Sequence, residues 1–457
     1  MIIDWRETIE ASVRNRARRA VAAAAAGKAA SGDSILPTHS LSWPETLLMP
    51  ESHLSAADSA AGELQPYELT MPPLVVFGPG RVAEVGRMAA TLGQRVWLVT
   101  GGASFASCGA REPLLAGLAE AKLPHEVVAR SAGEPTVDQL AAALAALPDD
   151  RSGVVVVAVG GGATIDLAKA LAALATNVDP CDLITAETAV LDRLEGVGRS
   201  LPILQPPLPV VAVPTTAGTG AEATRNAVIS CPRRRFKKSL RSPLMVPRAA
   251  VLDPTLTRSC SRQTVAAAGL DCLTQLIESF ISRRRWSLPQ ALVLETFPRA
   301  FAALPRVLAD PADDAARAAL LHAAFISGVS LGNSGLGLAH GVAAALGVEC
   351  GTPHGLACAV MLPVALRVNR QEAAAELACL DATLGGPPLP PAEATSRFID
   401  RVEQLCNQAG IPRSLAALGL ARDRLDWLAE HSGGNSMRGN PVQLPIAELR
   451  QLLESIY

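Results

Sequence analysis

The 457-residue sequence is poor in aromatic side chains and has no strong excess of charge of either sign. Aromatic residues make up 3% of the chain, so the core must be built from Ala, Leu and Val. The net charge of -2 argues against a general nucleic-acid binder, which would carry a broad positive field. No apolar run reaches the roughly 20 residues that span a bilayer. The 49% hydrophobic and 18% charged residues are typical of a folded chain rather than a disordered one.

The nine cysteines include no CxxC pair. Their odd number and scattered positions are typical of reduced thiols in a cytosolic protein rather than of a disulfide framework. We therefore expect a cytoplasmic protein whose partners are neither nucleic acids nor membranes.

The length favours two domains, preceded by an extension of different composition. Residues 1–65 begin with an Ala- and Arg-rich stretch that predicts a helix over 3–28, followed by a linker rich in Ser, Pro, Ala and Gly. Over residues 66–248, Val-rich runs alternate with Ala-rich helical patterns, which predicts an α/β domain with a parallel sheet buried on both faces. Residues 249–457 open with the apolar run AAVLDP and then carry helical periodicity almost throughout, which predicts an all-α domain. The clearest strand runs lie at 74–82, 95–102, 125–130, 153–162 and 208–216.

Two loops that follow predicted strands have the composition of a phosphate site. Gly160–Gly162 stand between a strand and a helical pattern at 164–176, where bare N–H groups and the helix dipole favour an anion. Their spacing is not the GxGxxG of the Rossmann fingerprint, and a tight turn without a ligand would use the same glycines. Residues 215–220 carry three hydroxyls and two glycines at a strand end, where ligands bind in open α/β sheets. An ordinary polar loop is the alternative there.

A carboxylate, an amide and two imidazoles occur in apolar helical sequence. Asp271 and Gln275 are four residues apart, so both side chains lie on one helix face. A buried carboxylate needs a partner, and a cation would serve. His340 and His354 lie in Gly-flanked apolar sequence and can complete a four-ligand divalent site. From spacing alone, two core histidines with ordinary hydrogen bonds explain the pattern at least as well.

Four blocks occur in an order that resembles the group III, iron-containing alcohol dehydrogenase family. They are VGGGATIDLAKA (159–170), VPTTAGTGAEAT (213–224), GLDCLTQLIES (269–279) and the two-histidine block at 337–363. The resemblance covers about residues 66–456. It implies an N-terminal NAD(P)-binding α/β domain, a helical domain that holds one divalent metal (Fe2+ or Zn2+), and hydride transfer between NAD(P)(H) and a small alcohol or carbonyl compound. A homo-oligomer is compatible with it.

The resemblance also implies roles for individual residues. Asp271, His340 and His354 match three of the four metal ligands, and no catalytic side chain beyond the metal site is implied. Lys237, sixteen residues before Asp253, matches the family's ribose-contacting lysine. We interpret its basic surroundings, 233–241, as a solvated loop rather than a nucleic-acid patch. The residues implied at the pyrophosphate and nicotinamide are Gly161, Gly162, Asp166, Thr215, Thr216 and Thr219.

The sequence departs from the family pattern at two important positions. Gln275 stands where the fourth ligand is usually His, and Ala344 stands where many members have another His one turn after the first metal His. An amide oxygen is a weaker donor than imidazole for Fe or Zn, so we expect weaker metal binding. A side-chain proton relay at Ala344 is missing. Ala221, where Ser is common, is a minor change.

The turn after the strand at 95–102 bears on the choice of cofactor. NAD-preferring enzymes often place an acid here to bind the ribose 2'-hydroxyl. The turn residues Gly101, Gly102 and Ser104 include none, so NADP(H) should be tolerated and its 2'-phosphate cradled. An NAD enzyme without a selecting residue is the open alternative.

Two other functions remain open from the sequence. The first is a dehydroquinate-synthase-like lyase, which shares the two-domain layout and uses NAD with a metal. The second is a pseudoenzyme scaffold that has lost a ligand at Gln275 and docks partners through residues 1–65. The intact block at 213–224 favours the dehydrogenase, and a metal assay separates the scaffold from both enzymes.

Overall fold

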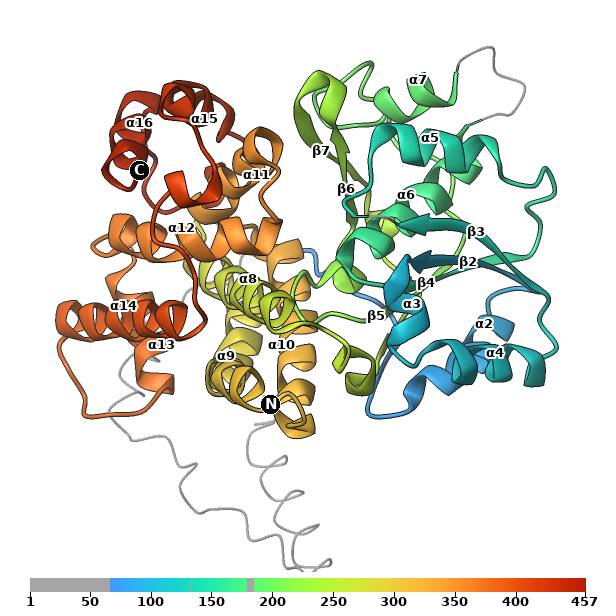
Figure 1. Cartoon of the computed structure of the whole chain (residues 1–457), viewed down its shortest axis with the longest axis horizontal. Helices are drawn as coiled ribbons and strands as arrows, with labels where there is room; N and C mark the ends of the chain where they lie inside the picture. Colours follow the sequence, from blue (N-terminus) through green and yellow to red (C-terminus); the bar gives the residue numbers. More distant parts are fainter. Residues whose placement is uncertain (1–65, 132, 179–184) are drawn as a thin grey trace, which may run out of the picture. The chain divides into compact units, whose positions relative to one another are not determined.

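The Val-rich segments form one six-stranded parallel sheet in the computed structural model, which describes residues 66–457 except 132 and 179–184 (Figure 1). The strand order is β1-β8-β5-β4-β2-β3. The predicted α/β fold and its strand runs are confirmed, whereas the predicted helix over 3–28 lies outside the described residues. The strands are β1 (Val75–Phe77), β2 (Arg95–Gly101), β3 (His125–Ser131), β4 (Val154–Gly160), β5 (Val210–Pro214) and β8 (Ala249–Leu252).

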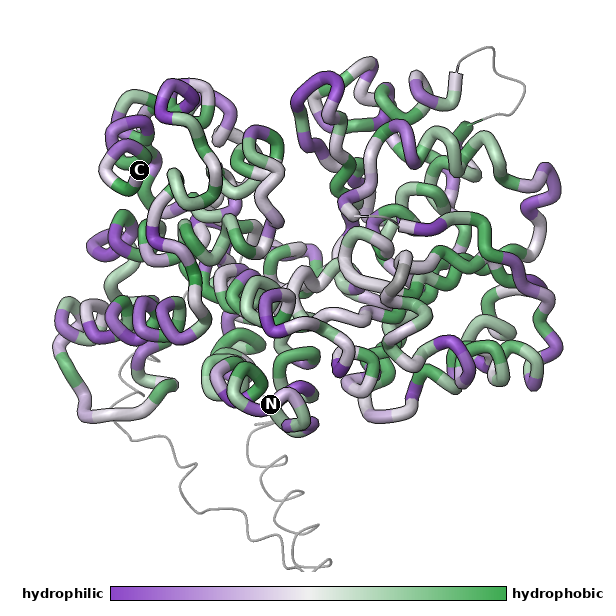
Figure 2. The backbone as a smooth tube through the Cα atoms, viewed as in Figure 1, coloured by the Kyte–Doolittle hydropathy of each residue, from purple (hydrophilic) through white to green (hydrophobic). Residues whose placement is uncertain are grey.

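Helices cover both faces of the sheet, which is why its central strands are apolar throughout. Every residue of β4 and β5 is buried. Alternate residues of β4 pack to opposite faces: Val156 against α5 (Val137–Ala145) and α6 (Gly162–Asn177), Val157 against α2 (Val85–Ala90) and α4 (Arg111–Glu120). Figure 2 shows the hydrophobic stretches that run through the centre of this region. The short helices α3 (Ala103–Ser107) and α7 (Ala186–Leu191) complete the α/β region.

Strand β8 begins at Ala249, just after the domain boundary predicted at residue 248. β8 pairs in parallel with both β1 and β5, so it lies inside the sheet. The α/β region therefore extends to Leu252 rather than ending at residue 248. The compact unit that the structure describes runs from Glu68 to Tyr457.

Residues 226–241 form an antiparallel hairpin, so the predicted solvated loop at 233–241 is wrong. β6 (Asn226–Cys231) pairs with β7 (Phe236–Arg241). The prediction failed because Lys and Arg residues conceal the alternation that buries Leu240. Ion pairs join Arg233 to Asp138 and Glu187, Arg235 to Glu349, Lys237 to Glu134, and Arg241 to Glu195.

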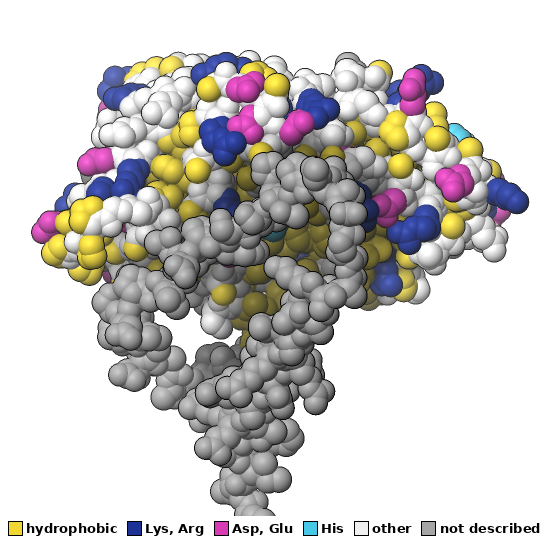
Figure 3. All heavy atoms as spheres, turned by 90° about the horizontal axis from the view of Figure 1, so that it is seen from below, with side chains coloured by type: hydrophobic (Ala, Val, Ile, Leu, Met, Phe, Trp, Pro, Cys, Tyr) yellow, Lys and Arg dark blue, Asp and Glu magenta, His cyan; other side chains and the backbone are white. Residues whose placement is uncertain are grey.

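Charges of both signs are mixed on the surface. On the visible part of the face in Figure 3, Lys and Arg side chains lie among Asp and Glu side chains.

The chain after β8 is helical, as predicted. α8 is the central helix of this region and packs against α9, α10 and α12. α8 and α10 are long and apolar enough to cross a membrane by composition, but 83% and 67% of their apolar windows are buried in the fold, as in core helices. The helices are α8 (Arg262–Ile281), α9 (Ser287–Ala309), α10 (Asp314–Ser334), α11 (Leu338–Cys350), α12 (His354–Asn369), α13 (Ala374–Thr383), α14 (Pro391–Gln408), α15 (Leu425–His431) and α16 (Ile446–Ser455).

A buried lysine ties the hairpin to the sheet. Lys169 of α6 lies 3.1 Å from Asp166 Oδ1 and donates to the carbonyl oxygen of Ala221 at 2.8 Å and to Thr224 Oγ1 at 2.9 Å. It also donates to the carbonyl oxygen of Asn226, where β6 begins. One ammonium group therefore satisfies four oxygens that the fold removes from water.

We expect Lys169→Met to lower the free energy of unfolding by about 3–5 kcal/mol, because it leaves the Asp166 carboxylate buried without its cation. Urea denaturation would measure the loss. The matched control is Lys238→Met, since Lys238 is exposed on β7 and should change stability by no more than about 0.5 kcal/mol. Equal stability of the two variants would contradict the role given to Lys169.

Candidate metal and dinucleotide site

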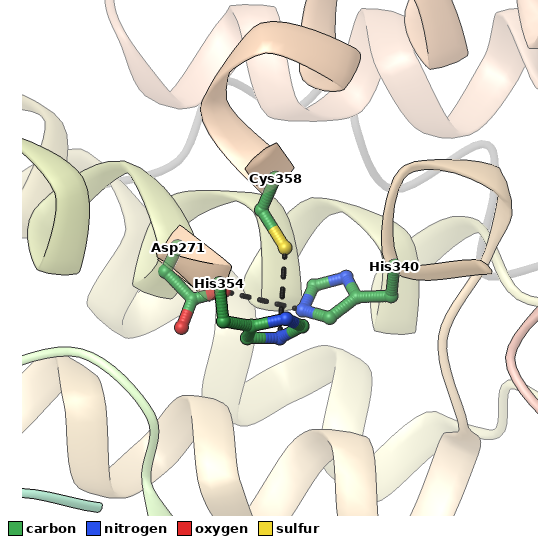
Figure 4. Close-up of side chains that lie close together, drawn as sticks. All are labelled: Asp271, His340, His354 and Cys358. Atoms are coloured by element: carbon green, nitrogen blue, oxygen red, sulfur yellow. Dashed lines mark hydrogen bonds and ion pairs between the residues drawn. The ribbon is translucent and has the colours of Figure 1, made fainter. Parts of the chain in front are cut away.

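Helices α8, α11 and α12 bring four metal-binding side chains together. Figure 4 shows them pointing toward one another: Asp271 from α8, His340 from α11, and His354 and Cys358 from α12. One donor atom from each lies within 4.8 Å of the others. Only His354 is partly exposed. The structure thus joins three of the predicted ligands and adds a cysteine that was not predicted.

A glycine allows α12 to approach α8 closely enough for this cluster to form. A Cβ atom on Gly355 would lie 2.5 Å from the carbonyl oxygen of Ala267 and 3.3 Å from Asp271 Cβ. No side chain fits at the first distance. Because Gly355 has no side chain, α12 lies close to α8, and the neighbouring His354 lies beside Asp271.

Several donor atoms of the cluster lack ordinary partners. Asp271 Oδ1, His340 Nε2 and His354 Nδ1 make no hydrogen bond to the described residues. His340 Nε2 lies only 3.3 Å from Asp271 Oδ1. Buried polar atoms are normally paired, so the adjacent Asp271 Oδ1 and His340 Nε2 fit a cation between them. Carboxylate, imidazole and thiol donors suit a divalent transition metal.

Glu278 determines which nitrogen of His340 faces the cluster. Its carboxylate lies 2.7 Å from His340 Nδ1 and accepts from the N–H groups of Gly337 at 2.9 Å and Ala339 at 2.7 Å. Because a carboxylate only accepts, Nδ1 carries a proton and donates to Glu278, and Nε2 is the ring nitrogen that faces Asp271 and can bind a metal once it has released its own proton. A carboxylate behind the ring is the usual support of a metal-binding histidine.

Burial and charge shift the pKa values at the cluster. Burial would raise the pKa of Asp271, but the neighbouring His340, His354 and Cys358 lower it. Burial and the charge of Lys237 lower the pKa of His354 to about 4, so this imidazole is neutral at pH 7. Burial raises the pKa of Cys358 to about 12. Burial would lower the pKa of His340, but surrounding negative groups raise it well above its usual value.

Gln275, the predicted fourth ligand, is buried one turn after Asp271. Its Oε1 accepts a hydrogen bond of 2.6 Å from Ser327 of α10. The amide oxygen therefore has a protein partner, and its role as a metal ligand stays a prediction. Ala344 lies in α11 one turn after His340, as the sequence implies.

The two glycine-containing turns meet at the carboxyl edge of the sheet. A Cβ atom on Gly161 would lie 3.3 Å from Thr216 Oγ1, and one on Gly162 would lie 2.4 Å from Thr219 Oγ1. The N–H of Thr215 donates to the Gly160 carbonyl oxygen at 3.0 Å. Close packing thus explains part of the glycine content, and the same turn presents the amino end of α6, a site that favours anions.

The second turn also contacts the helices that carry the cluster. A Cβ atom on Gly218 would lie 2.7 Å from the Cβ of Ala268, one turn before Asp271 in α8. Gly220 has a φ of 59°. A Cβ atom on Gly220 would lie 2.5 Å from the Cα atom of Gly328 in α10. The turn at 215–220 and the cluster of donor side chains are therefore neighbours.

Asp166 has partners within the protein. Its Oδ2 accepts from the N–H of Val228 in β6 at 3.0 Å, and Oδ1 faces Lys169. These contacts anchor the hairpin, and contact with a cofactor stays a prediction.

The predicted selector turn follows β2, which lies next to β4 in the sheet. The N–H of Gly102 donates to the Ser131 carbonyl oxygen at 3.0 Å. A Cβ atom on Gly101 would lie 2.1 Å from Ser104 Oγ, whereas one on Gly102 would meet only the Ser131 oxygen at 3.4 Å. A side chain is therefore tolerated at Gly102 but not at Gly101 without movement of Ser104.

Lys237 is not on a solvated loop. It lies in β7 with 8% of its side chain exposed, and its Nζ is 2.5 Å from Glu134 Oε1. Its amino group also lies 3.9 Å from where a Cβ of Gly347 in α11 would stand. Lys237 thus lies between the hairpin and α11, and its contact with ribose stays a prediction.

Sequence reasoning missed Cys358, Glu278 and Lys169. Each follows a predicted residue at helical spacing: Cys358 four after His354, Glu278 seven after Asp271, and Lys169 three after Asp166. Asking which polar side chains share a helix face with each candidate would have found them.

Two family models match the chain. The model described as "Iron-containing alcohol dehydrogenase" matches residues 72–254, and "Fe-containing alcohol dehydrogenase family, C-terminal" matches residues 265–457. Together they cover the sheet and the helical region.

Several relatives align over almost their full length. NAD-dependent methanol dehydrogenase of Bacillus methanolicus is 27% identical over 390 residues, which are 84% of this chain and 98% of the relative. Lactaldehyde reductase of Escherichia coli (strain K12) is 28% identical over 386 residues, 83% of this chain and 97% of the relative. The crystal structure of 1,3-propanediol oxidoreductase is 26% identical with a TM-score of 0.77, and the match covers 86% of this chain and 100% of that chain.

We expect Glu278→Gln to weaken metal binding by roughly 10–100-fold, because the support of His340 is lost. Competition with a chromogenic chelator measures the affinity. Glu295→Gln, on the partly exposed side of α9, is the matched control and should bind metal like the wild type. Unchanged affinity in a folded Glu278→Gln protein would show that Glu278 does not support a ligand.

Proposed function

Because this chain belongs to the iron-containing alcohol dehydrogenase family, we propose that it transfers a hydride reversibly between NAD(H) and a small alcohol or the corresponding aldehyde or ketone. Three relatives have names that support small substrates, namely methanol dehydrogenase, lactaldehyde reductase and 1,3-propanediol oxidoreductase, whereas another is named for long-chain alcohols.

The observation that carries this proposal is the convergence of Asp271, His340 and His354 beside the turn at 215–220. A divalent cation supplies Lewis-acid polarisation of a carbonyl oxygen when bound, and NAD supplies the hydride acceptor or donor. The three side chains hold the cation, and Glu278 fixes His340 in the tautomer that can do so. Packing of Gly218 on Ala268 sets the turn against the same helix as Asp271.

The chain's own residues also position the dinucleotide. The N–H groups at the start of α6, around Gly161 and Gly162, receive the pyrophosphate. The hydroxyls of Thr216 and Thr219 lie against this turn and would contact the cofactor there. Ala344 carries no group that transfers a proton, so we assign proton exchange to solvent.

The alternatives from the sequence are less well supported. Both halves of the chain match the dehydrogenase family, which disfavours the dehydroquinate-synthase-like lyase. A scaffold that docks partners through residues 1–65 would depend on a segment outside the described residues, and the cluster of unpaired donors favours a working metal site.

Several finer points belong to the same proposal. The family description supports iron as the metal. We propose zinc as the alternative metal and NADP(H) as an additional cofactor. We further propose that Gly101, Gly102 and Ser104 contact the adenosine ribose, together with Lys237. A cytoplasmic location and a small-molecule partner agree with this activity.

We expect His354→Ala to lose bound metal and to lower turnover by at least about 1000-fold, because Lewis-acid stabilisation is worth several kcal/mol. Metal content is measured by mass spectrometry, and turnover by NADH oxidation with a panel of small aldehydes. NADH binding, followed by fluorescence titration, should persist.

His322→Ala is the control for His354→Ala, because His322 lies in α10 against Glu295 and its side chain is 37% exposed. It should keep metal and turnover. A His354→Ala protein that retains both would overturn the proposal, as would a metal-loaded wild type inactive on every aldehyde and alcohol in the panel.

We expect Gly102→Asp to lower the use of NADPH relative to NADH. A carboxylate next to the 2'-phosphate costs on the order of 1–3 kcal/mol, or roughly 5- to 150-fold in the ratio of kcat/KM values. The ratio is the readout because a damaged fold would lower both cofactors equally. An unchanged ratio would place the ribose elsewhere. A wild type that binds NAD(H) but not NADP(H) would contradict the expectation that this turn tolerates a 2'-phosphate.

A further inference from the structure

Cys358 lies at the metal cluster in a chain that lacks the usual fourth histidine. It follows His354 by four residues in α12, so the two side chains share a helix face. Its Sγ lies 3.7 Å from His354 Nε2, and the donor atoms of Asp271 and His340 are within 4.8 Å of it. The side chain is completely buried.

The thiol of Cys358 differs from other thiols in its surroundings. A backbone carbonyl oxygen accepts from each of three other thiols: Phe105 from Cys108, Thr215 from Cys260, and Ala359 from Cys406. Cys358 instead faces an imidazole nitrogen. Its neighbours are themselves metal donors, and Asp271 and His340 each have an unpartnered atom there.

Two of the spacings between donor atoms match those around a tetrahedral ion. Bonds of about 2.0–2.1 Å to N or O and about 2.3 Å to S place ligand atoms roughly 3.3–3.6 Å apart around zinc. Asp271 Oδ1 and His340 Nε2 are 3.3 Å apart, and His354 Nε2 and Cys358 Sγ are 3.7 Å apart. An ion at the centre requires little movement of these pairs.

We propose that Cys358 is the fourth protein ligand of the metal, in place of Gln275, and that the site therefore selects zinc over iron. This inference rests on the proposed function only in requiring a divalent metal at the cluster. The thiol releases its proton to solvent as the metal binds, and the thiolate becomes the ligand.

Two features favour Cys358 over Gln275. The Gln275 oxygen already accepts a 2.6 Å hydrogen bond from Ser327. With Asp271, a thiolate supplies two negative charges against a divalent cation, whereas an amide supplies none, and uncompensated charge is costly in a buried site. A soft thiolate also favours zinc and cobalt over the harder ions.

The test is substitution of cobalt(II) into the full-length protein after removal of its metal. Wild type should show a thiolate-to-cobalt charge-transfer band in the near ultraviolet, and Cys358→Ser should lack it. Gln275→Met should keep the band. Cys272→Ala should keep it too, because Cys272 follows Asp271 in α8 but lies outside the cluster.

Selectivity gives a second readout. Anaerobic competition between equal amounts of zinc and ferrous ions should load wild type mainly with zinc. Cys358→Ser should reduce the zinc-to-iron ratio by more than about 10-fold. Removing even a group that only supports a ligand typically lowers metal affinity by about 10-fold, and loss of a ligand should have a larger effect. Equal ratios in the two proteins would overturn the preference.

X-ray absorption of the zinc-loaded wild type needs no variant, so it decides the case if Cys358→Ser fails to fold. One sulfur at about 2.3 Å is expected. Zinc bound by nitrogen and oxygen alone, or loss of metal in Gln275→Met but not in Cys358→Ser, would overturn the Cys358 ligand while leaving the dehydrogenase intact. A wild type that binds no divalent metal would instead overturn the proposed function itself.

Discussion

Backbone contact between the turn after β5 and two helices is the constraint on which the site depends. Gly218 packs on Ala268 of α8, and Gly220 packs on Gly328 of α10, at distances that leave no room for a Cβ atom. Such contacts allow no sliding, so the carboxyl edge of the sheet is fixed against the helix that carries Asp271. A hydride can pass between cofactor and substrate only when the two are held in register in this way.

Burial then determines what the cluster can be. Asp271, His340 and Cys358 are removed from water, and several of their polar atoms have no protein partner. Glu278 keeps the His340 proton on the far side of the ring. A cation is the one kind of group that satisfies a carboxylate, an imidazole lone pair and a thiolate together, which is why the unpaired donors point to a metal rather than to a hydrogen-bonded core.

Much of the fold follows from local patterns. The runs of Val in β4 and β5 predict strands because both faces of a parallel sheet are covered by helices. The hairpin at 226–241 escaped prediction because its charges are matched by residues distant in sequence, such as Glu134 for Lys237 and Glu349 for Arg235. Helical spacing after Asp166 could have found Lys169 itself but not its oxygen partners, which come from another segment.

The sequence by itself determined the order of the domains, the two turns rich in glycine and hydroxyls, and the separate positions of Asp271, His340 and His354, because each is written in a short stretch of residues. Only the tertiary structure decided that Cys358 joins them while the Gln275 oxygen is bonded to Ser327, because three helices meet there. It also decided that Lys237 faces Glu134 instead of solvent. Those outcomes depend on which helix faces and strands meet across the fold, and the residues of a short segment do not determine such contacts.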